Sequence, residues 1–380
     1  MEVVYTVSAK FGGAGIGFTA YQFVRTLHRQ GHLKQAIVGY EGPHDLPRER
    51  IRSFFWMRGV AWLMRDYSLI RDVIFDHVAT LFLPPSDIYH GWSHQCLRTL
   101  ARAKDLGAIT FLERPNSHDV YQDRLLREEY ARWGYTPTHR LREWGIRRGV
   151  AEYERADYIT VPSTFAYNSM VAEGIPEDKL FLIPYGVDVH RFTPGTPPKD
   201  VFRLLFVGQV SLRKGIPYLL RAWQQLRLPR AELWLAGRVT PDAQHVVAPY
   251  RDDPSIHFLG HVQDLPPVYR QASAFVLPSI EEGSALVTYE AMASGLPLIV
   301  TPHTGAVARE GQEAIYVPIR DVEALAQAIQ KLYEDTDLRE GMGAAARALA
   351  LEYTWEKAGE RLIHAYKTAL QRAGRDSQCP

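Results

Sequence analysis

Cysteine is scarce in this sequence, with only Cys96 and Cys379 among 380 residues. Two thiols so far apart predict neither a disulfide framework nor a zinc site, and they are typical of a reducing compartment. No apolar run approaches the roughly 18 residues that a membrane-spanning helix requires. The acidic second residue, at the start of an apolar strand pattern, argues against a signal peptide. We therefore expect a cytoplasmic protein.

The sequence also lacks a strong net charge, because 44 Lys and Arg residues accompany 43 Asp and Glu residues. The formal net charge is +1, and neither half of the sequence is strongly basic. We therefore predict no binding to nucleic acid. The hydrophobic share of 46% is that of a soluble globular protein. At this length the chain suffices for two domains that each bury a core.

Apolar strands alternate with helices twice along the chain. The first series starts with a strand over 3–7 and a glycine-rich loop, and the second starts with a strand over 204–207. A polar, proline-rich connector follows Asp188 and separates the two series. We predict an α/β fold of two Rossmann-like domains with the ligand in the cleft between them. The predicted boundaries are 1–192, 193–352 and a terminal helix with its tail over 353–380.

One stretch of the second series combines carboxylates with a helix start. A strand over 274–277 leads into a Glu-Gly-Ser turn and a helix that ends at Gly295, and we expect Ser284 to cap this helix. The N–H groups at the helix start form an anion site between Glu282 and Glu290. Because carboxylates accept hydrogen bonds from hydroxyl groups, the combination suggests a sugar nucleotide. The same pattern also occurs in α/β proteins without such a ligand.

Two loops of the first series follow strands of the predicted sheet. The loop around Gly13 could present N–H groups to a phosphate, although it lacks the Gly-Lys-Ser/Thr ending of a P-loop. His118 lies in a polar loop after the strand over 108–113, where α/β sheets place ligand groups. A ligand contact and a purely structural role both stay open for this histidine.

Residues 43–75 alternate arginines with aromatic and other apolar side chains. Such a stretch can rest on a membrane surface or a lipid-linked acceptor. It can equally form a pair of helices with arginines on the solvated face. The residues concerned are Arg48, Arg50, Arg52, Arg58, Arg65 and Arg71, with Phe54, Phe55, Trp56, Trp62 and Leu63.

In their order and spacing, these motifs resemble glycosyltransferase family 4, the retaining glycosyltransferases of GT-B fold. The resemblance extends from Gly12 to about Trp355 and is strongest in the second half. The matching segments are the loop from Gly12 to Gly15, residues 183–188 with Phe192, the loop from Gly208 to Gly215, Glu282-x7-Glu290, and residues 291–297.

The resemblance implies a role for each matching residue. Lys214 corresponds to a phosphate-binding lysine, and Arg213 compensates for Gln209, which stands where the family often has arginine. His118 and Glu282 lie near the donor sugar, and Glu290 accepts from the ribose hydroxyls. His118, Lys214 and Glu282 form the predicted reacting centre. The predicted contacts to the nucleotide sugar are Gly13, Gly208, Arg213, Lys214, Glu282, Gly283, Ser284, Ala285, Leu286 and Glu290.

The implied activity is metal-independent transfer of a sugar, with retention, from a nucleoside diphosphate to an acceptor hydroxyl. UDP or GDP is the expected nucleotide, and no separate cofactor is expected. The implied acceptor is a saccharide or lipid-linked molecule of glycan, glycolipid or cell-envelope polysaccharide synthesis, bound by the first domain. A GT-B nucleotide-sugar epimerase and a nicotinamide-dependent oxidoreductase are the alternatives. Asp335-Thr336-Asp337 is interpreted as a helix boundary and not as a metal site.

Overall fold

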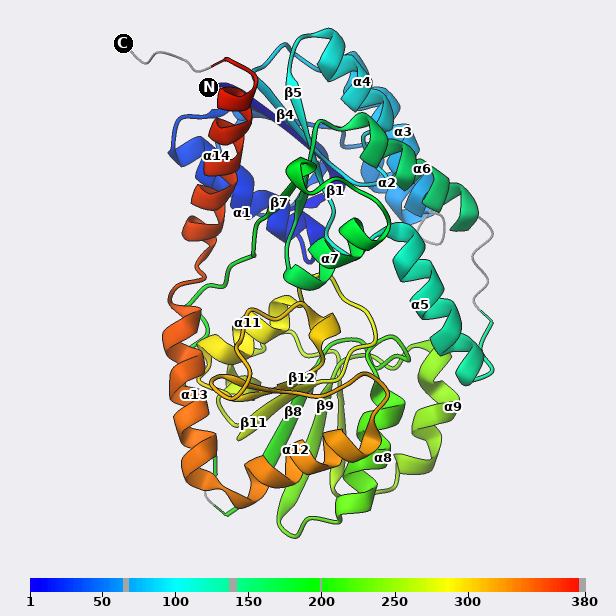
Figure 1. Cartoon of the computed structure of the whole chain (residues 1–380), viewed down its shortest axis with the longest axis vertical. Coiled ribbons are helices and arrows are strands. Elements are labelled where there is room, and N and C mark those ends of the chain that lie inside the picture. Colours follow the sequence, from blue (N-terminus) through cyan, green and yellow to red (C-terminus); the bar gives the residue numbers. More distant parts are fainter. Residues whose placement is uncertain (64–67, 137–141, 199, 376–380) are drawn as a thin grey trace.

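The computed structural model describes residues 1–63, 68–136, 142–198 and 200–375. They form two α/β halves stacked along the long axis of the molecule (Figure 1). In the first half, the described strands form a seven-stranded parallel sheet of order β3-β2-β1-β4-β5-β6-β7. Its strands and α-helices are β1 (Val3–Phe11), α1 (Ile16–Arg29), β2 (Leu33–Glu41), β3 (Ile51–Ser53), α2 (Met57–Leu63), α3 (Ser68–Leu81), β4 (Ile88–Trp92), α4 (Leu97–Asp105), β5 (Ile109–Glu113), α5 (Asp119–Arg132), α6 (Arg142–Arg155), β6 (Tyr158–Val161), α7 (Thr164–Ala172) and β7 (Leu180–Leu182).

In the second half, the described strands form a six-stranded parallel sheet of order β10-β9-β8-β11-β12-β13. Its strands and α-helices are β8 (Phe202–Val207), α8 (Ile216–Leu226), β9 (Ala231–Ala236), α9 (Gln244–Val247), β10 (Ile256–Gly260), α10 (Pro266–Tyr269), β11 (Ala274–Leu277), α11 (Leu286–Ala293), β12 (Leu298–Val300), β13 (Ala314–Tyr316), α12 (Val322–Glu334) and α13 (Thr336–Ala350), and α14 (Trp355–Arg372) follows. The structure confirms the predicted α/β architecture.

The central strands are nearly continuous runs of buried apolar residues, as expected when helices cover both faces of a parallel sheet. All residues of β8 and β11 are buried, for example. Strand order reverses between β1 and β4 in the first sheet and between β8 and β11 in the second. The loops that follow β5 and β11 contact each other, so carboxyl ends of strands from both sheets meet at the junction. This is where α/β sheets bind ligands.

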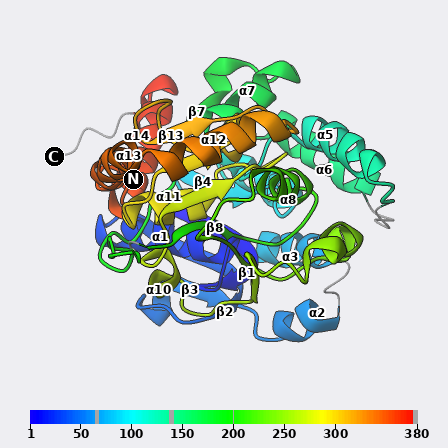
Figure 2. The same ribbon diagram turned by 90° about the horizontal axis from the view of Figure 1, so that it is seen from below.

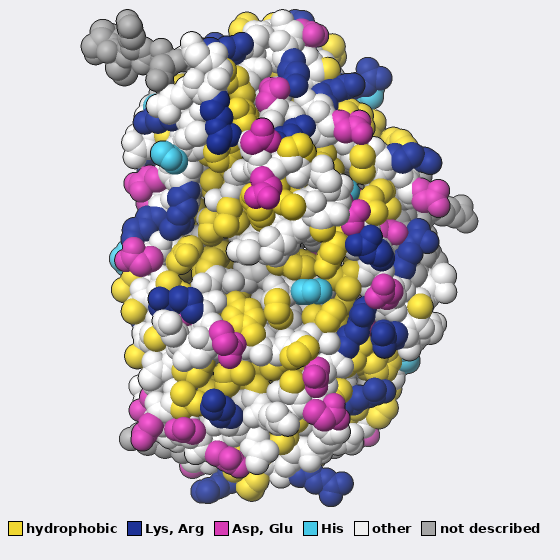
Figure 3. Space-filling model, in the orientation of Figure 1, with side chains coloured by type: hydrophobic (Ala, Val, Ile, Leu, Met, Phe, Trp, Pro, Cys, Tyr) yellow, Lys and Arg dark blue, Asp and Glu magenta, His cyan; other side chains and the backbone are white. Residues whose placement is uncertain are grey.

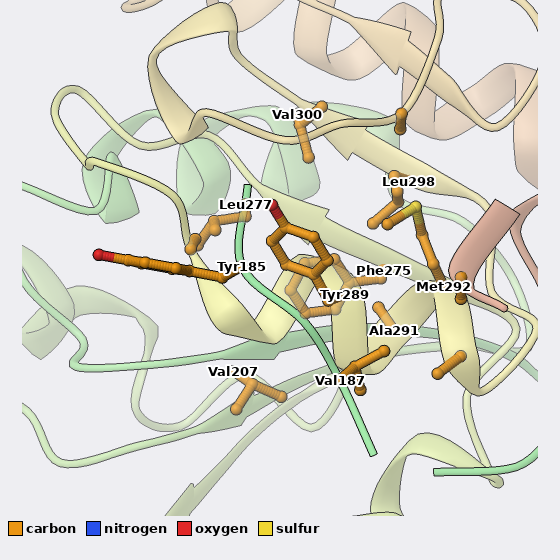
Figure 4. Packing of buried hydrophobic residues seen from close by; sticks show 14 of the residues in the cluster. Tyr185, Val187, Val207, Phe275, Leu277, Tyr289, Ala291, Met292, Leu298 and Val300 are labelled. Atoms are coloured by element: carbon orange, nitrogen blue, oxygen red, sulfur yellow. The ribbon is translucent and has the colours of Figure 1, made fainter. Parts of the chain in front are cut away.

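Two segments connect the halves. The first runs from β7 towards β8, and its Tyr185 and Val187 lie among side chains of α11 and β11 such as Tyr289 and Phe275 (Figure 4). The second leads from α13 into α14, which returns along the first half (Figure 1). The Tyr366 hydroxyl of α14 lies 2.8 Å from Nδ1 of His90 in β4. The predicted crossing helix is therefore confirmed.

One local prediction is confirmed and one is wrong. Asp335 caps α13 and so marks a helix boundary as interpreted, and Ser163 caps α7 in the same way. Ser284 does not cap α11, because Ala285 occupies the N-cap position and the Ser284 hydroxyl lies 3.0 Å from that of Tyr289. The three-residue strands β3 and β13 were not predicted, since such short segments carry no readable alternation.

Among the described helices, none is both long and apolar enough to cross a bilayer. In the space-filling view, hydrophobic and basic side chains are both visible around the level where the two halves meet (Figure 3).

Candidate active site

The turn after β11 and the loop after β8 meet in a cluster of opposite charges. Nζ of Lys214 forms an ion pair with Oε1 of Glu282, and Nη2 of Arg213 lies 3.6 Å from the same oxygen. A Cβ on Gly208 would lie 3.7 Å from Cε of Lys214, so the lysine chain passes over this glycine. Burial alone would raise the pKa of Glu282, but the charges of Arg213 and Lys214 outweigh it and lower the pKa. Glu282 is therefore ionised near neutral pH.

Glu281, the preceding residue, is fully buried and joins the two halves. Its carboxylate accepts hydrogen bonds from Nε of Arg213 at 2.9 Å, the Ser117 hydroxyl at 2.7 Å and the Gln122 amide at 2.9 Å. Because Ser117 and Gln122 belong to the first half, this carboxylate connects the segment that follows β5 to the loop after β8, which contains Arg213. Sequence reasoning missed Glu281. The signal was present in the Glu281-Glu282 pair in the turn that follows an apolar strand.

The predicted anion site at the start of α11 is partly occupied by protein groups. The N–H of Ala285 donates to the carbonyl of Thr304 at 3.0 Å, so this group is engaged in the structure. The Ser284 hydroxyl donates to the carbonyl of Gly305 at 3.3 Å. A Cβ on Gly283 would lie 1.5 Å from the Pro115 carbonyl oxygen, so only glycine permits this close contact between the halves. Leu286 is the first residue of α11.

Glu290 lies on α11 and is half-buried. Its Oε2 accepts a hydrogen bond from the Tyr269 hydroxyl at 2.9 Å, and burial raises the pKa of its carboxyl group. Gly13 follows β1 in the first half, where its N–H donates to the Lys10 carbonyl at 2.9 Å. Among the described contacts, neither residue touches the Arg213–Lys214–Glu282 cluster, so any shared ligand has to bridge these positions.

His118 is the N-cap of α5, and its side chain has structural partners. Nδ1 of the imidazole accepts a hydrogen bond from the N–H of Val120 at 3.2 Å, and the backbone N–H of His118 donates to Oγ of Ser169 at 2.9 Å. Burial lowers the pKa of the imidazole, which favours the neutral ring near pH 7. The residue before it, Ser117, makes the contact to the second half through Glu281. A contact between His118 and a donor sugar stays a prediction.

Comparison with known proteins identifies the family. Residues 13–191 match the family model described as Glycosyltransferase Family 4, and residues 201–335 match that described as Glycosyl transferases group 1. The O-antigen chain mannosyltransferase B of Escherichia coli is 33% identical over 330 residues, which is 82% of this chain and 77% of that protein. The chain belongs to glycosyltransferase family 4.

Other proteins are also similar to this family 4 chain. A D-inositol 3-phosphate glycosyltransferase of Corynebacterium urealyticum is 25% identical over 88% of this chain and 74% of its own length. For four further relatives, the match spans 61–64% of the relative's length. The sucrose-phosphate synthase of Thermosynechococcus elongatus has a TM-score of 0.76 at 19% identity, over 98% of this chain and 99% of that one. HepE of Anabaena, in complex with UDP and glucose, has a TM-score of 0.67 at 15% identity, over 97% of this chain and 100% of that one. The fold is GT-B.

Proposed function

We propose that this family 4 chain transfers a sugar, with retention and without a metal ion, from a nucleoside diphosphate to an acceptor hydroxyl. The observation that carries the proposal is the pairing of Arg213 and Lys214 with Glu282 beside the start of α11. Fixed cations at this position would stabilise the charge that develops on a departing diphosphate. Relatives that are named mannosyltransferases and a structural neighbour bound to UDP support the same activity.

The proposed transfer breaks the bond between the anomeric carbon and the phosphate oxygen. The acceptor oxygen bonds to the anomeric carbon on the face from which the phosphate departs, so the configuration is kept. The acceptor proton passes to the leaving phosphate oxygen, and no separate general base is needed. In this scheme Lys214 and Arg213 neutralise the departing diphosphate, and the carboxylate of Glu282 lies near the sugar. The first half binds the acceptor, for which a saccharide or lipid-linked glycan is proposed.

The proposed site of the ribose is Glu290, whose carboxylate has only one hydrogen bond donor, Tyr269, among the described residues. UDP, GDP and ADP are compared by thermal shift, because a ligand that binds the native state raises the unfolding temperature. UDP or GDP is expected to give the largest shift. The Glu290→Ala variant is expected to bind that nucleotide roughly 10- to 100-fold more weakly, as hydrogen bonds to a charged group are lost.

The matched control for this experiment is Glu323→Ala, which removes an exposed carboxylate of α12. It is expected to bind the nucleotide like the wild type. Release of the nucleotide from its sugar conjugate is then measured for all three proteins. Full retention of nucleotide affinity and turnover by Glu290→Ala would contradict the assignment of Glu290, and an unchanged wild-type unfolding temperature with every nucleotide would contradict the transferase itself.

We also propose that the surface of residues 43–75 rests on the inner face of a membrane with anionic lipids. The stretch includes β3, α2 and the start of α3, and α2 lies at the edge of the molecule (Figure 2). Arg65 lies outside the described residues. The Phe55, Trp62 and Leu63 side chains are 86%, 79% and 72% exposed. This aromatic–arginine surface also contains exposed Trp56, Arg48, Arg50, Arg52 and Arg58. Aromatic and basic side chains together suit a lipid interface.

Sedimentation with phosphatidylglycerol–phosphatidylcholine vesicles tests the membrane proposal. The wild type is expected to bind at low salt and to bind less at high salt, because salt screens the attraction of the arginines to lipid phosphates. The double variant Phe55→Ser, Trp62→Ser is expected to lose most of this binding. Leu351→Ser, an exposed apolar residue after α13, is the control and should bind normally. Wild-type protein that stays in the supernatant at low salt would contradict the proposal.

A further inference from the structure

In the first half, the sheet splits at the point where its strand order reverses. β1 pairs with β4 only from Val3 to Tyr5, and beyond Tyr5 the two strands have no further paired residues. The loop after β4 inserts here, and the Gln95 side chain accepts from the N–H of Ser8 in β1 at 2.7 Å. A split between adjacent parallel strands at a topological switch point is where α/β sheets bind ligands. His94 lies in this loop.

The backbone of His94 is held in an unusual conformation by two buried ionisable side chains. Its φ of 69° lies in the left-handed region, which is unfavourable for residues other than glycine. Its N–H donates to Glu152 and its carbonyl accepts from Nε of Arg148 at 2.8 Å. Both partners lie on α6 and are buried. These contacts fix the strained backbone, so the loop presents the imidazole in one defined position.

The imidazole of His94 is oriented by Asp119. Its Nε2 lies 3.1 Å from Oδ1 of Asp119, which also contacts Nη2 of Arg114 at 3.2 Å, and Oδ2 accepts from the Tyr153 hydroxyl at 2.5 Å. Burial would raise the pKa of Asp119, but the charges of Arg114 and His94 outweigh it and lower the pKa. Burial would lower the pKa of His94, but the charge of Asp119 and its hydrogen bond outweigh burial and raise it. The ionised carboxylate holds a proton on Nε2, so Nδ1 offers an N–H when the ring is charged and a lone pair when the ring is neutral. Nδ1 has no hydrogen bond partner among the described residues, and the side chain is 28% exposed.

A continuous set of contacts links the imidazole of His94 to the Arg213–Lys214–Glu282 cluster. Arg114 bonds both Asp119 and the Ser117 carbonyl, the latter at 2.6 Å and 2.8 Å. The Ser117 hydroxyl in turn bonds Glu281, the neighbour of Glu282. His94 therefore lies on the opposite half from the proposed donor site but is positioned by the same polar network. Such a residue is suited to contact the second substrate.

We propose that His94 binds the acceptor, its Nδ1 forming a hydrogen bond with a hydroxyl group of an acceptor saccharide, and that Asp119 is a positioning residue. This inference rests on the proposed transferase function. It assigns the acceptor to the switch point between β1 and β4 and predicts a hydroxyl group of the acceptor at that point. A substrate without a hydroxyl group there would leave the oriented imidazole without its partner.

The first experiment measures how transfer partitions between an added acceptor and water. The nucleotide sugar that the wild type turns over fastest is incubated with methyl α-mannopyranoside or methyl α-glucopyranoside, and the ratio of glycoside to free sugar is determined. Glycine suits the positive φ, so the His94→Gly variant should keep the fold. It is expected to lower this ratio roughly 5- to 10-fold, because one hydrogen bond to the acceptor is lost. His94→Asn also tolerates this φ and places an amide oxygen near the position of Nδ1, so it should recover most of the ratio.

Two readouts separate acceptor binding from a structural role. Nucleotide affinity by titration calorimetry should stay within twofold of the wild type in both variants. His77→Ala, which removes an exposed histidine of α3, should leave the partition ratio unchanged. An unchanged ratio in His94→Gly would overturn the proposal. A fall in nucleotide affinity that matches the fall in transfer would overturn it as well, because the residue would then act only through the fold.

The second experiment does not depend on turnover. Protein labelled with ¹⁵N-histidine is examined by NMR above pH 8, and the His94 signals are assigned from the His94→Asn spectrum. A proton on Nε2 and an unprotonated Nδ1 are expected, and the opposite tautomer would overturn the proposal. Failure of the transferase function would appear as absent nucleotide binding by the wild type. It is therefore distinguishable from failure of the His94 assignment.

Discussion

Replacement of Lys214 by alanine is expected to lower kcat/KM for the nucleotide sugar by roughly 100- to 1000-fold, the usual effect of removing one preorganised group that stabilises developing charge. Lys214 lies over Gly208 and pairs with Glu282, so its ammonium group is fixed before substrate arrives. The remaining cation, Arg213, has its Nε bonded to Glu281 and cannot occupy the same position. Initial rates of nucleotide release at several donor concentrations measure the effect.

Lys214→Arg is the matched variant, because it keeps the charge but changes the shape of the cation. It should retain more activity than Lys214→Ala, and thermal unfolding of both variants checks that the fold is intact. A Lys214→Ala protein that folds normally and keeps more than about a third of the wild-type kcat/KM would contradict the proposed role of this lysine.

Replacement of Glu129 by alanine is expected to lower the free energy of unfolding by about 3 kcal/mol, as for other buried ion pairs that lose one partner. Glu129 lies on α5 of the first half and is fully buried. It accepts from Nε of Arg320 at 2.7 Å and from the Tyr218 hydroxyl at 2.9 Å, both in the second half, and from Trp133 at 3.0 Å. The variant leaves the largely buried guanidinium group of Arg320 with the exposed Glu128 as its remaining carboxylate partner.

Glu128→Ala is the control, since the neighbouring Glu128 also contacts Arg320, at 3.3 Å, but is 55% exposed. Because solvent screens an exposed pair, this variant should lose less than about 1 kcal/mol. Urea-induced unfolding, followed by tryptophan fluorescence, compares the two variants with the wild type. Equal losses in the two variants would show that the buried position of Glu129 confers no special stability on the contact between the halves.

The architecture could be predicted because its signals are local. Each strand before a glycine or polar loop is an apolar run, and caps such as Ser163 and Asp335 stand at the helix starts that they form. The Ser284 prediction was wrong because the turn after β11 bends towards Gly305, which occupies the hydroxyl that would otherwise cap the helix. Propensity identifies a residue that can cap a helix, whereas the tertiary contacts of the turn decide whether it does.

The site was only partly predictable from the sequence. Arg213 and Lys214 were assigned through the resemblance of the loop after β8 to the family's phosphate loop. Glu282 was found because it lies in the turn between a strand and a helix, where α/β sheets bind ligands. Glu281 and His94 also follow strands, but their roles depend on partners such as Ser117, 164 positions from Glu281, and Asp119. No periodicity records such pairings, because they arise only when the two halves and the β1–β4 split are assembled.

The ion pair between Lys214 and Glu282 also bears on how a product would leave. In the proposed site, a diphosphate that binds Lys214 has to share the ammonium group with a carboxylate attached to the same domain, or displace that carboxylate. Such a tethered group competes at an effective concentration that is typically millimolar or higher, and it is never diluted. The carboxylate therefore acts as a built-in competitor that weakens the hold on the spent nucleotide. Turnover gains from this arrangement whenever departure of the nucleotide limits the rate.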